Sequence, residues 1–185
     1  MDTPAGNGKM KVRLRSFSNS LPMSLLKARE SVMQRFRSSL RLFNITEQQW
    51  RVLRALSSVE SIEVTVLAKA TFLLAPSLSR ILKDLEERHL VIKTPVPSDL
   101  RRSLVSVTPD GLKLIDAVAP HSERIYSEIT EAFGEEKMKL LQDLLKELET
   151  DINNLPAIVH DAADRQMPEF SQTTAGLPRG RPRKS

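Results

Sequence analysis

The sequence predicts a mainly α-helical protein with one small β-hairpin, and two features of its hydrophobic pattern indicate this. Over most of the chain, apolar residues recur every three or four positions, which is the period of one helix face. Between residues 91 and 108 the period changes to two, as in a strand with one buried face. A chain of 185 residues with 40% hydrophobic content can bury one good core, so we expect one folded unit with tails.

Four helices are expected before the hairpin. An apolar row from Leu25 to Phe43 marks the first. Thr46 and Gln49 then form a capping-box pattern, which starts a second helix that ends at Ser57 or Ser58. A short third helix fits residues 64–71. Proline suits the first turn of a helix, so Pro76 indicates a fourth helix over 75–88, whose inward face is apolar: Leu78, Ile81, Leu82 and Leu85.

The hairpin comprises a strand over 91–96, a turn over 97–102 with Arg101 and Arg102 at its tip, and a strand over 103–108. Pro109 then starts a fifth helix, and Gly134 separates it from a sixth. The sixth helix carries a wide apolar stripe over 138–152. From residue 156 to 185 proline, serine, threonine and glycine dominate, so we expect a flexible tail there, matched by a basic disordered arm over 1–20.

Charge is distributed unevenly along the chain. Residues 21–108 hold 14 basic and 8 acidic side chains, whereas residues 109–170 hold 6 basic and 14 acidic ones. Both ends are basic, with net charges of +3 over 1–20 and +4 over 171–185. The first part of the folded unit can therefore face a polyanion, and the second part is repelled by one.

The composition argues against several classes of protein. There is no cysteine, which excludes disulfides and thiolate metal sites and favours a reducing, cytoplasmic location. The three histidines show no ligand spacing, and no Gly-rich phosphate loop or nucleophile motif is present, so we expect no enzyme, metal or cofactor. The N-terminus lacks the apolar core of a signal peptide, and no stretch is long enough to span a membrane.

A short helix, a tight connection, a second helix and a basic hairpin together predict a winged helix-turn-helix, in which the second helix enters the major groove of DNA. The outward face of helix 75–88 carries residue types that read bases or contact phosphates, namely Ser77, Ser79, Arg80 and Lys83. The alternative is an ordinary solvated helix. The hairpin with Arg101 and Arg102 that follows directly decides in favour of DNA binding.

The stretch LAKATFLLAPSLSRILKDLEERHLV, followed by DLRRSLVSVTPDG, resembles the MarR family of dimeric bacterial transcription regulators. The hairpin matches the family pattern at Asp99, Arg101, Val105, Val107 and Thr108, and the resemblance extends from about Leu21 to Ile152. Within the family, LLKARESVM and NITEQQWRVLRAL resemble the subgroup that represses homoprotocatechuate degradation operons.

The resemblance implies that helix 75–88 is the recognition helix, that Arg101 enters the minor groove and that Asp99 orients it. It also implies a homodimer on palindromic DNA, with a winged-helix domain over 21–155, a DNA-binding lobe over 44–108 and dimerisation helices over 21–43 and 109–155. The stripe over 138–152 independently favours a dimer, because it is too wide for one winged domain to cover. The alternative is that this helix folds back on its own subunit.

His89 stands where the family usually has glycine, just after the recognition helix. That position commonly takes a left-handed conformation at the end of a helix. A residue other than glycine costs about 1 kcal/mol there, and histidine is among the more tolerant types. We therefore predict a positive φ and a structural role for His89.

Arg29 lies in the apolar row of the first helix and therefore needs an anionic partner. One alternative is a protein carboxylate such as Glu47 or Glu30. The other is the carboxylate of a small aromatic acid bound beside Trp50, with Arg51 and Arg54 as secondary contacts. Such a ligand would release DNA if it preferred a dimer with misplaced recognition helices. The sequence leaves the choice open.

The tail segment PRGRPRKS contains Arg179, Gly180, Arg181 and Pro182, the core of an AT-hook-like motif. Glycine lets such a segment lie deep in a narrow A·T minor groove, and arginines favour the negative potential there. The alternative is a solvated basic tail. Basic arms at both ends also permit a different function, that of a general architectural DNA-binding protein without an effector.

Overall fold

The computed structural model describes residues 16–158, with the backbone alone at Leu100 and Arg101. Most of the predicted basic arm and the whole AT-hook-like segment lie outside these residues. The described part forms two compact units that divide after Met138, within the last helix. Near the start of the described residues, Phe17–Asn19 form a short 3-10 helix, inside the segment expected to be a disordered arm.

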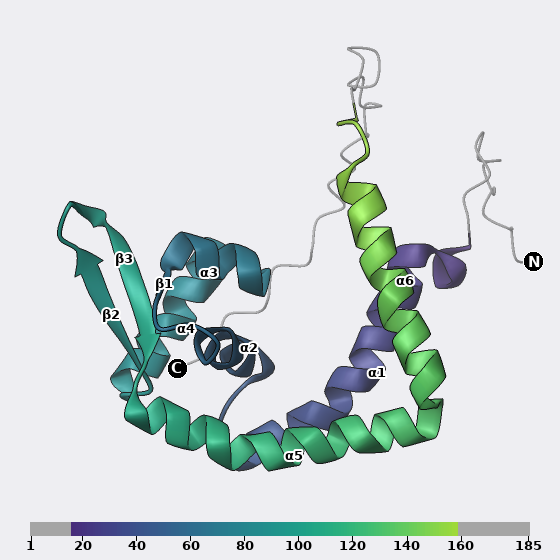
Figure 1. Cartoon of the computed structure of the whole chain (residues 1–185), viewed down its shortest axis with the longest axis horizontal. Coiled ribbons are helices and arrows are strands. Elements are labelled where there is room, and N and C mark those ends of the chain that lie inside the picture. The colour runs from purple at the N-terminus through teal and green to yellow at the C-terminus, as the bar shows by residue number, and fades with distance from the viewer. Residues whose placement is uncertain (1–15, 159–185) are drawn as a thin grey trace, which may run out of the picture. The chain divides into compact units, whose positions relative to one another are not determined.

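The first unit contains five α-helices and a small sheet (Figure 1). The helices are α1 (Leu21–Leu42), α2 (Glu47–Leu56), α3 (Val64–Thr71), α4 (Ala75–Glu87) and α5 (Pro109–Phe133). Three antiparallel strands, β1 (Ile62–Glu63), β2 (Val91–Val96) and β3 (Asp99–Val107), lie in the order β1-β3-β2. In the region described, the fold is thus the predicted mainly helical winged helix-turn-helix, with one additional short strand.

Local capping residues explain where the helices begin. At α2 the predicted capping box is present, since the Gln49 amide donates to Thr46 Oγ1 at 3.2 Å and the Thr46 amide donates to Gln49 Oε1 at 2.8 Å. At α5, Thr108 Oγ1 accepts a hydrogen bond of 3.0 Å from the Gly111 amide, and Pro109 occupies the first position. Pro76 lies in the first turn of α4, as the sequence predicts.

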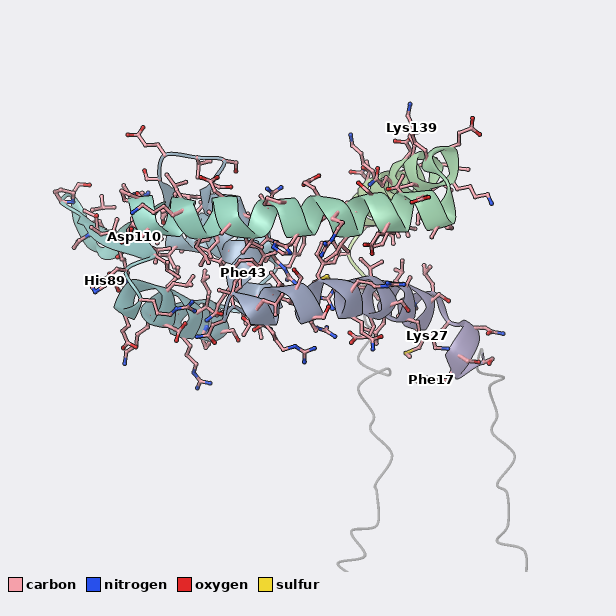
Figure 2. All side chains as sticks on the ribbon, turned by 90° about the horizontal axis from the view of Figure 1, so that it is seen from below. Phe17, Lys27, Phe43, His89, Asp110 and Lys139 are labelled. Carbon is pink, nitrogen blue, oxygen red and sulfur yellow. The ribbon has the colours of Figure 1, made fainter. Side chains whose placement is uncertain are left out.

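The end of α4 confirms the expected conformation of His89, whose φ is 58°. The His89 and Leu90 amides donate back to the carbonyls of Glu86 and Leu85, both at 2.9 Å, so the left-handed residue closes the helix and redirects the chain into β2. The His89 carbonyl accepts a 2.6 Å hydrogen bond from the Thr108 hydroxyl. Figure 2 shows His89 near Asp110 at the beginning of α5.

The hairpin differs from the prediction in its turn. Only residues 97 and 98 form the turn, and β3 already begins at Asp99. The pairing changes from Pro95 opposite Ser103 to Val96 opposite Asp99, so residues 100–102 form a bulge. Proline is tolerated in β2 because that strand lies at the edge of the sheet.

The core of the first unit lies where α2, α3, α4 and β3 meet the C-terminal half of α1 and the N-terminal half of α5. Its fully buried side chains are nearly all aliphatic: Leu40, Val52, Leu53, Leu56, Leu67, Leu78, Leu85, Val105 and Val118. Helices α1 and α5 run side by side, as Figure 2 shows. The rings of Phe36 and Tyr126 contact across them with centroids 4.9 Å apart, and those of Phe43 and His121 with centroids 5.1 Å apart.

The last helix, α6 (Glu135–Asn153), follows Gly134, which has a φ of 97°. No residue of α6 is buried. Five of its apolar side chains are 40–59% exposed, namely Leu140, Leu141, Leu144, Leu145 and Ile152, whereas Met138 and Leu148 are half-buried. The wide apolar stripe predicted from the sequence is therefore present as an uncovered surface.

No single helix within residues 16–158 is long and apolar enough to cross a membrane; α3 and α4 reach that length and hydropathy only as a pair bent by 108°. Over the same residues, no group of three or more histidine, aspartate or glutamate side chains could hold a metal ion.

Candidate nucleic-acid interface

Helix α4 presents a polar face to solvent. Its apolar side packs Leu78, Leu82 and Leu85 into the core, whereas the four residues predicted to contact DNA are all exposed: Ser77, Ser79, Arg80 and Lys83. Ser79 donates a hydrogen bond of 2.9 Å to the Ala75 carbonyl of its own helix, and Lys83 lies 3.8 Å from Glu87. Within the described residues Arg80 has no hydrogen bond or ion pair, so its guanidinium is available to an external anion.

The β2–β3 wing places Asp99 at the start of β3, with Arg101 and Arg102 in the bulge that follows. Arg102 already has a protein partner, since it donates to Glu63 of β1 at 2.5 Å. The hydrogen bond raises the pKa of Arg102, and the same bond, aided by one from Thr65, lowers the pKa of Glu63. Arg102 therefore ties the bulge of the wing to β1, a role that sequence reasoning missed.

Polar contacts from α2 hold the helix-turn-helix in place. Gln49 Nε2 donates to Asp84 Oδ2 of α4 at 2.6 Å, and Arg88 lies 3.6 Å from the same carboxylate. Arg51 donates to the Thr71 carbonyl at 3.0 Å, at the end of α3. The first two turns of α2 are thus attached to the end of α3 and to the C-terminal half of α4.

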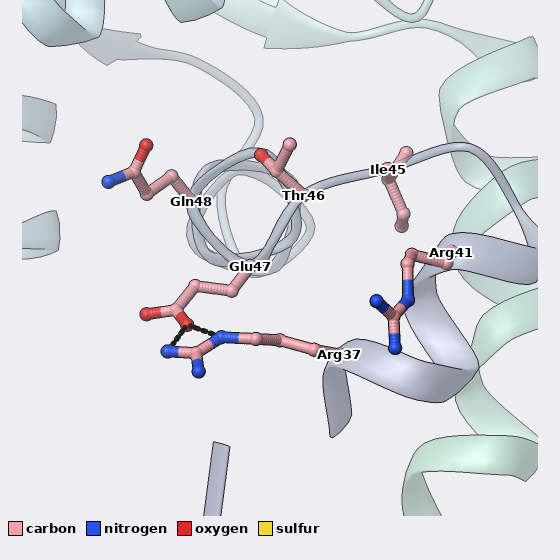
Figure 3. Close-up of a pocket in the computed structure, with 6 residues that line it drawn as sticks. All are labelled: Arg37, Arg41, Ile45, Thr46, Glu47 and Gln48. Atoms are coloured by element: carbon pink, nitrogen blue, oxygen red, sulfur yellow. Dashed lines mark hydrogen bonds and ion pairs between the residues drawn. The ribbon is translucent and has the colours of Figure 1, made fainter. Parts of the chain in front are cut away.

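The carboxylate of Glu47, at the start of α2, is shared by three arginines. Arg29 and Arg37 reach it from α1, Arg37 with an Nε to Oε2 distance of 2.8 Å (Figure 3). Arg51 reaches it from the next turn of α2 at 3.3 Å. Arg37 also pairs with Glu30, so a polar cluster joins the middle of α1 to the first turns of α2.

Burial alone would raise the pKa of Glu47, but hydrogen bonds from Arg37 and Arg29 outweigh it and hold the pKa below its ordinary value. The hydrogen bond with Arg37 likewise lowers the pKa of Glu30. The Glu47 side chain is therefore ionised at neutral pH. Of the two partners considered for Arg29, a protein carboxylate or a ligand carboxylate, this structure has the protein carboxylate, that of Glu47.

The four candidate effector residues make two separate sets of contacts. Arg29 and Arg51 meet at Glu47, whereas Trp50 is only 9% exposed and packs into the core with the Arg54 guanidinium 6.0 Å from its ring centroid. Beside Glu47 lies a hollow of about 310 Å³ (Figure 3), lined by Arg37, Arg41, Ile45, Thr46, Glu47 and Gln48. Sequence reasoning missed Arg37 and Arg41, although their mutual spacing of four places both near the same side of α1.

Replacing Glu47 by glutamine is expected to lower the free energy of unfolding by about 1–2 kcal/mol at pH 7, because three arginines lose their shared charge. The loss of stability is small because those arginines are 36–44% exposed and remain partly hydrated. The pKa of Glu47 is lower in the folded state, so its contribution is complete well above pH 4.5 and is lost as the pH falls through the folded pKa. Urea unfolding at pH 7 and near pH 3.5 measures both effects.

Glu30→Gln is the matched control. Glu30 is 53% exposed and pairs with Arg37 alone, so its replacement should cost less than that of Glu47 at pH 7. A difference between wild type and Glu47→Gln that stays constant down to pH 3.5 would show that the charge of Glu47 contributes nothing.

The comparisons with known proteins agree with this geometry. Residues 43–102 match the model of the MarR family. The regulator FarR of Neisseria gonorrhoeae is 40% identical over 129 residues, covering 70% of this chain and 88% of FarR. The homoprotocatechuate degradative operon repressor of Escherichia coli is 37% identical over the same length, covering 70% of this chain and 87% of that repressor.

A solved structure supports the same assignment over most of the described residues. The crystal structure of NadR in complex with 4-hydroxyphenylacetate is 38% identical in sequence, with a TM-score of 0.63, and covers 74% of this chain and 97% of NadR. This chain and FarR share 40% of their residues over 88% of the length of FarR. The residues that match the family model comprise the helix-turn-helix and the first part of the wing. The chain belongs to the MarR family of DNA-binding transcriptional regulators and is not an enzyme.

Proposed function

We propose that the protein is a homodimeric repressor that binds a palindromic operator and is released by a small aromatic carboxylate. The observation that carries the proposal is the presence of an exposed polar face on α4 and a bulged basic wing in one compact unit. In this arrangement α4 enters the major groove through Ser77, Ser79, Arg80 and Lys83. Arg101, oriented by Asp99, enters the neighbouring minor groove, with Arg102 beside it in the same bulge.

Uncovered apolar surface supports the homodimer. Besides the α6 stripe, the N-terminal half of α1 leaves Leu25, Leu26 and Val32 37–52% exposed. Exposed apolar surface of this kind, on each of the two helices, is unusual on a monomer and is covered when a second copy contributes the same helices. A dimer also places two α4 helices on the successive half-sites of a palindrome. In addition, we propose that the segment containing Arg179, Gly180, Arg181 and Pro182 adds affinity through the minor groove, acting at high effective concentration once the dimer is bound.

The class of effector is supported by the relatives and by the arginines around Glu47. One relative is named for the homoprotocatechuate operon, and NadR is solved with 4-hydroxyphenylacetate, so both names refer to phenolic acids. In this chain a carboxylate ligand could compete with Glu47 for Arg29 and Arg51, with Trp50 and Arg54 beside it. Arg51 also donates a hydrogen bond to the Thr71 carbonyl at the end of α3. Loss of the Glu47–Arg51 pair would therefore alter a contact just before the recognition helix.

Titrating the operator-bound protein with hydroxylated phenylacetates and cinnamates is expected to weaken operator binding by about 10²-fold for at least one of them, which needs about 3 kcal/mol of coupling. Arg29→Ala should bind the operator and respond much less. Arg35→Ala is the matched control, because Arg35 is an exposed arginine of α1 that pairs with no carboxylate among the described residues. Release by none of these acids would exclude an aromatic-acid effector.

The same assay distinguishes a specific repressor from a general architectural protein. At fixed salt a specific regulator binds its operator about 10³-fold or more tightly than random DNA. Equal affinity for both would support the architectural alternative.

A further inference from the structure

Two large apolar side chains stand in solvent at the connection between α3 and α4. Phe72 is 84% exposed and Leu74 is 79% exposed, whereas Leu73 between them packs against the core. Phe72 has a φ of 51°, a conformation that glycine or asparagine adopts more readily than a bulky residue. Neither the packing of the first unit nor the backbone conformation accounts for large apolar groups at these two positions.

The N-terminus of α4 has neither a capping side chain nor an acidic residue. Leu74 occupies the N-cap position, its side chain makes no capping hydrogen bond, and the first turn holds no acidic residue. A serine or aspartate at that position would satisfy an amide of the first turn and is the usual choice. With leucine there, no acidic or capping side chain compensates the positive end of the helix dipole at the N-terminus of α4, and an apolar side chain lies beside it.

Leu74 extends the exposed polar row of α4. Residues three apart lie next to one another on a helix, so Leu74 adjoins Ser77, Ser77 adjoins Arg80 and Arg80 adjoins Lys83 in a line that winds round the exposed side of α4. All four are exposed. The line is apolar at its N-terminal end, hydroxylic in the middle and cationic towards its C-terminal end. In a helix-turn-helix the N-terminal residues of the recognition helix meet base edges, whereas arginine and lysine also reach phosphates.

We propose that Leu74 contacts the C5-methyl group of a thymine in each half-site of the operator and thereby contributes to sequence specificity. This methyl is the apolar group that a base pair displays in the major groove, and an aliphatic side chain excludes water from it. The inference rests on the proposed function, because it requires α4 to read the operator. It adds a specificity-determining residue to the polar set on α4.

Deoxyuridine substitution tests the contact, since uracil differs from thymine only by the missing methyl. The operator is selected from random-sequence DNA with the full-length wild-type protein, and each thymine of the half-site is then replaced in turn. Fluorescence anisotropy at fixed salt gives the dissociation constants. For the wild type, one position should show a loss of about fourfold per half-site, the size expected for one buried methyl group.

Leu74→Ala should weaken binding to the unmodified operator by at least the same factor and abolish the effect of deoxyuridine at that position. Leu74→Met, which keeps an aliphatic contact, should retain most of that effect. Val59→Ala is the control for loss of an exposed apolar group, because Val59 is 41% exposed in the loop after α2. It should give the wild-type deoxyuridine profile.

The inference is overturned if no thymine position is sensitive in the wild type, or if the sensitive position keeps its full effect in Leu74→Ala. Either result leaves the proposed function intact as long as the wild type still prefers its selected site to random DNA. A wild type without that preference would overturn the proposed function itself.

Discussion

Replacing Arg80 by alanine is expected to weaken operator binding between about 30-fold and about 3 × 10⁴-fold, because each lost base contact is worth about 1–3 kcal/mol and the proposed homodimer loses two. Specificity should relax at the base pair that Arg80 reads. Anisotropy titrations against the operator and against a scrambled duplex, at one salt concentration, measure both changes.

The structure makes Arg80 a suitable probe, because the folded chain does not use its side chain. Within residues 16–158 it has no ion pair or hydrogen bond, and it is exposed on α4. The thermal unfolding midpoint of Arg80→Ala should therefore stay close to that of the wild type. An effect on DNA binding without an effect on stability places the residue at the interface.

Two neighbouring variants provide controls. Lys83→Ala should weaken binding to all sequences about equally and reduce the salt slope by about one per half-site, as loss of a phosphate contact does. Arg102→Ala should affect stability as well as binding, because Arg102 pairs with Glu63 of β1. If Arg80→Ala weakened operator and scrambled DNA equally, Arg80 would be a phosphate contact, and if it weakened neither, α4 would not be the reading helix.

Helix boundaries were predictable because the residues that set them act locally. The Thr46 and Gln49 capping box, Pro109 and Gly134 each determine the conformation of their own few residues, and the helices begin or end where they stand. The positive φ of His89 was predictable for the same reason, since helix termination depends on the last turn alone.

The sheet was less predictable because strand pairing is not local. Two residues, Ile62 and Glu63, become β1 only because β3 offers Val105 and Leu104 as partners some forty positions later. The prediction of a turn over 97–102 was wrong for a related reason, since only residues 97 and 98 form the turn. Asp99 pairs with Val96, and the extra residues are absorbed in a bulge rather than in the loop.

In the candidate site too, the features set by local sequence were predictable and those set by contacts between distant residues were not. The exposed face of α4 followed from the helical period, since Leu78, Leu82 and Leu85 fix which side is inward. The pairing of Arg29 with Glu47 was considered from the sequence but could not be chosen, because only the packing of α1 on α2 brings the two together. The Arg37–Glu47, Arg29–Glu47 and Arg102–Glu63 pairs are separated by 10, 18 and 39 positions, distances along the chain at which charge spacing is uninformative.

Replacing Gly111 by alanine is expected to lower the free energy of unfolding by about 3 kcal/mol, the upper part of the range for forcing a carbon atom into a packed site. A Cβ atom at Gly111 would collide with the Leu90 carbonyl oxygen and come within 2.7 Å of Val107 Cγ2. Neither neighbour can move freely. The Leu90 carbonyl accepts the Thr108 amide at 3.1 Å, and Val107 lies in β3 opposite Val91. The expected fall in the thermal midpoint is about 6–12 °C, measured by circular dichroism.

The sign of the Gly111 effect is the decisive part of the result. Within a helix, alanine is favoured over glycine by about 1 kcal/mol, so an unhindered position would become more stable on this substitution. Asp110→Ala, one residue earlier on the exposed side of the same turn, removes only a surface pair with Lys113 and should change the midpoint little. Gly111 joins the end of α4, the wing and the start of α5, so Gly111→Ala should also weaken operator binding, although its side chain would not reach DNA. A midpoint at or above that of the wild type would mean that α5 does not pack on the α4–β2 junction as closely as the Leu90 and Val107 contacts require.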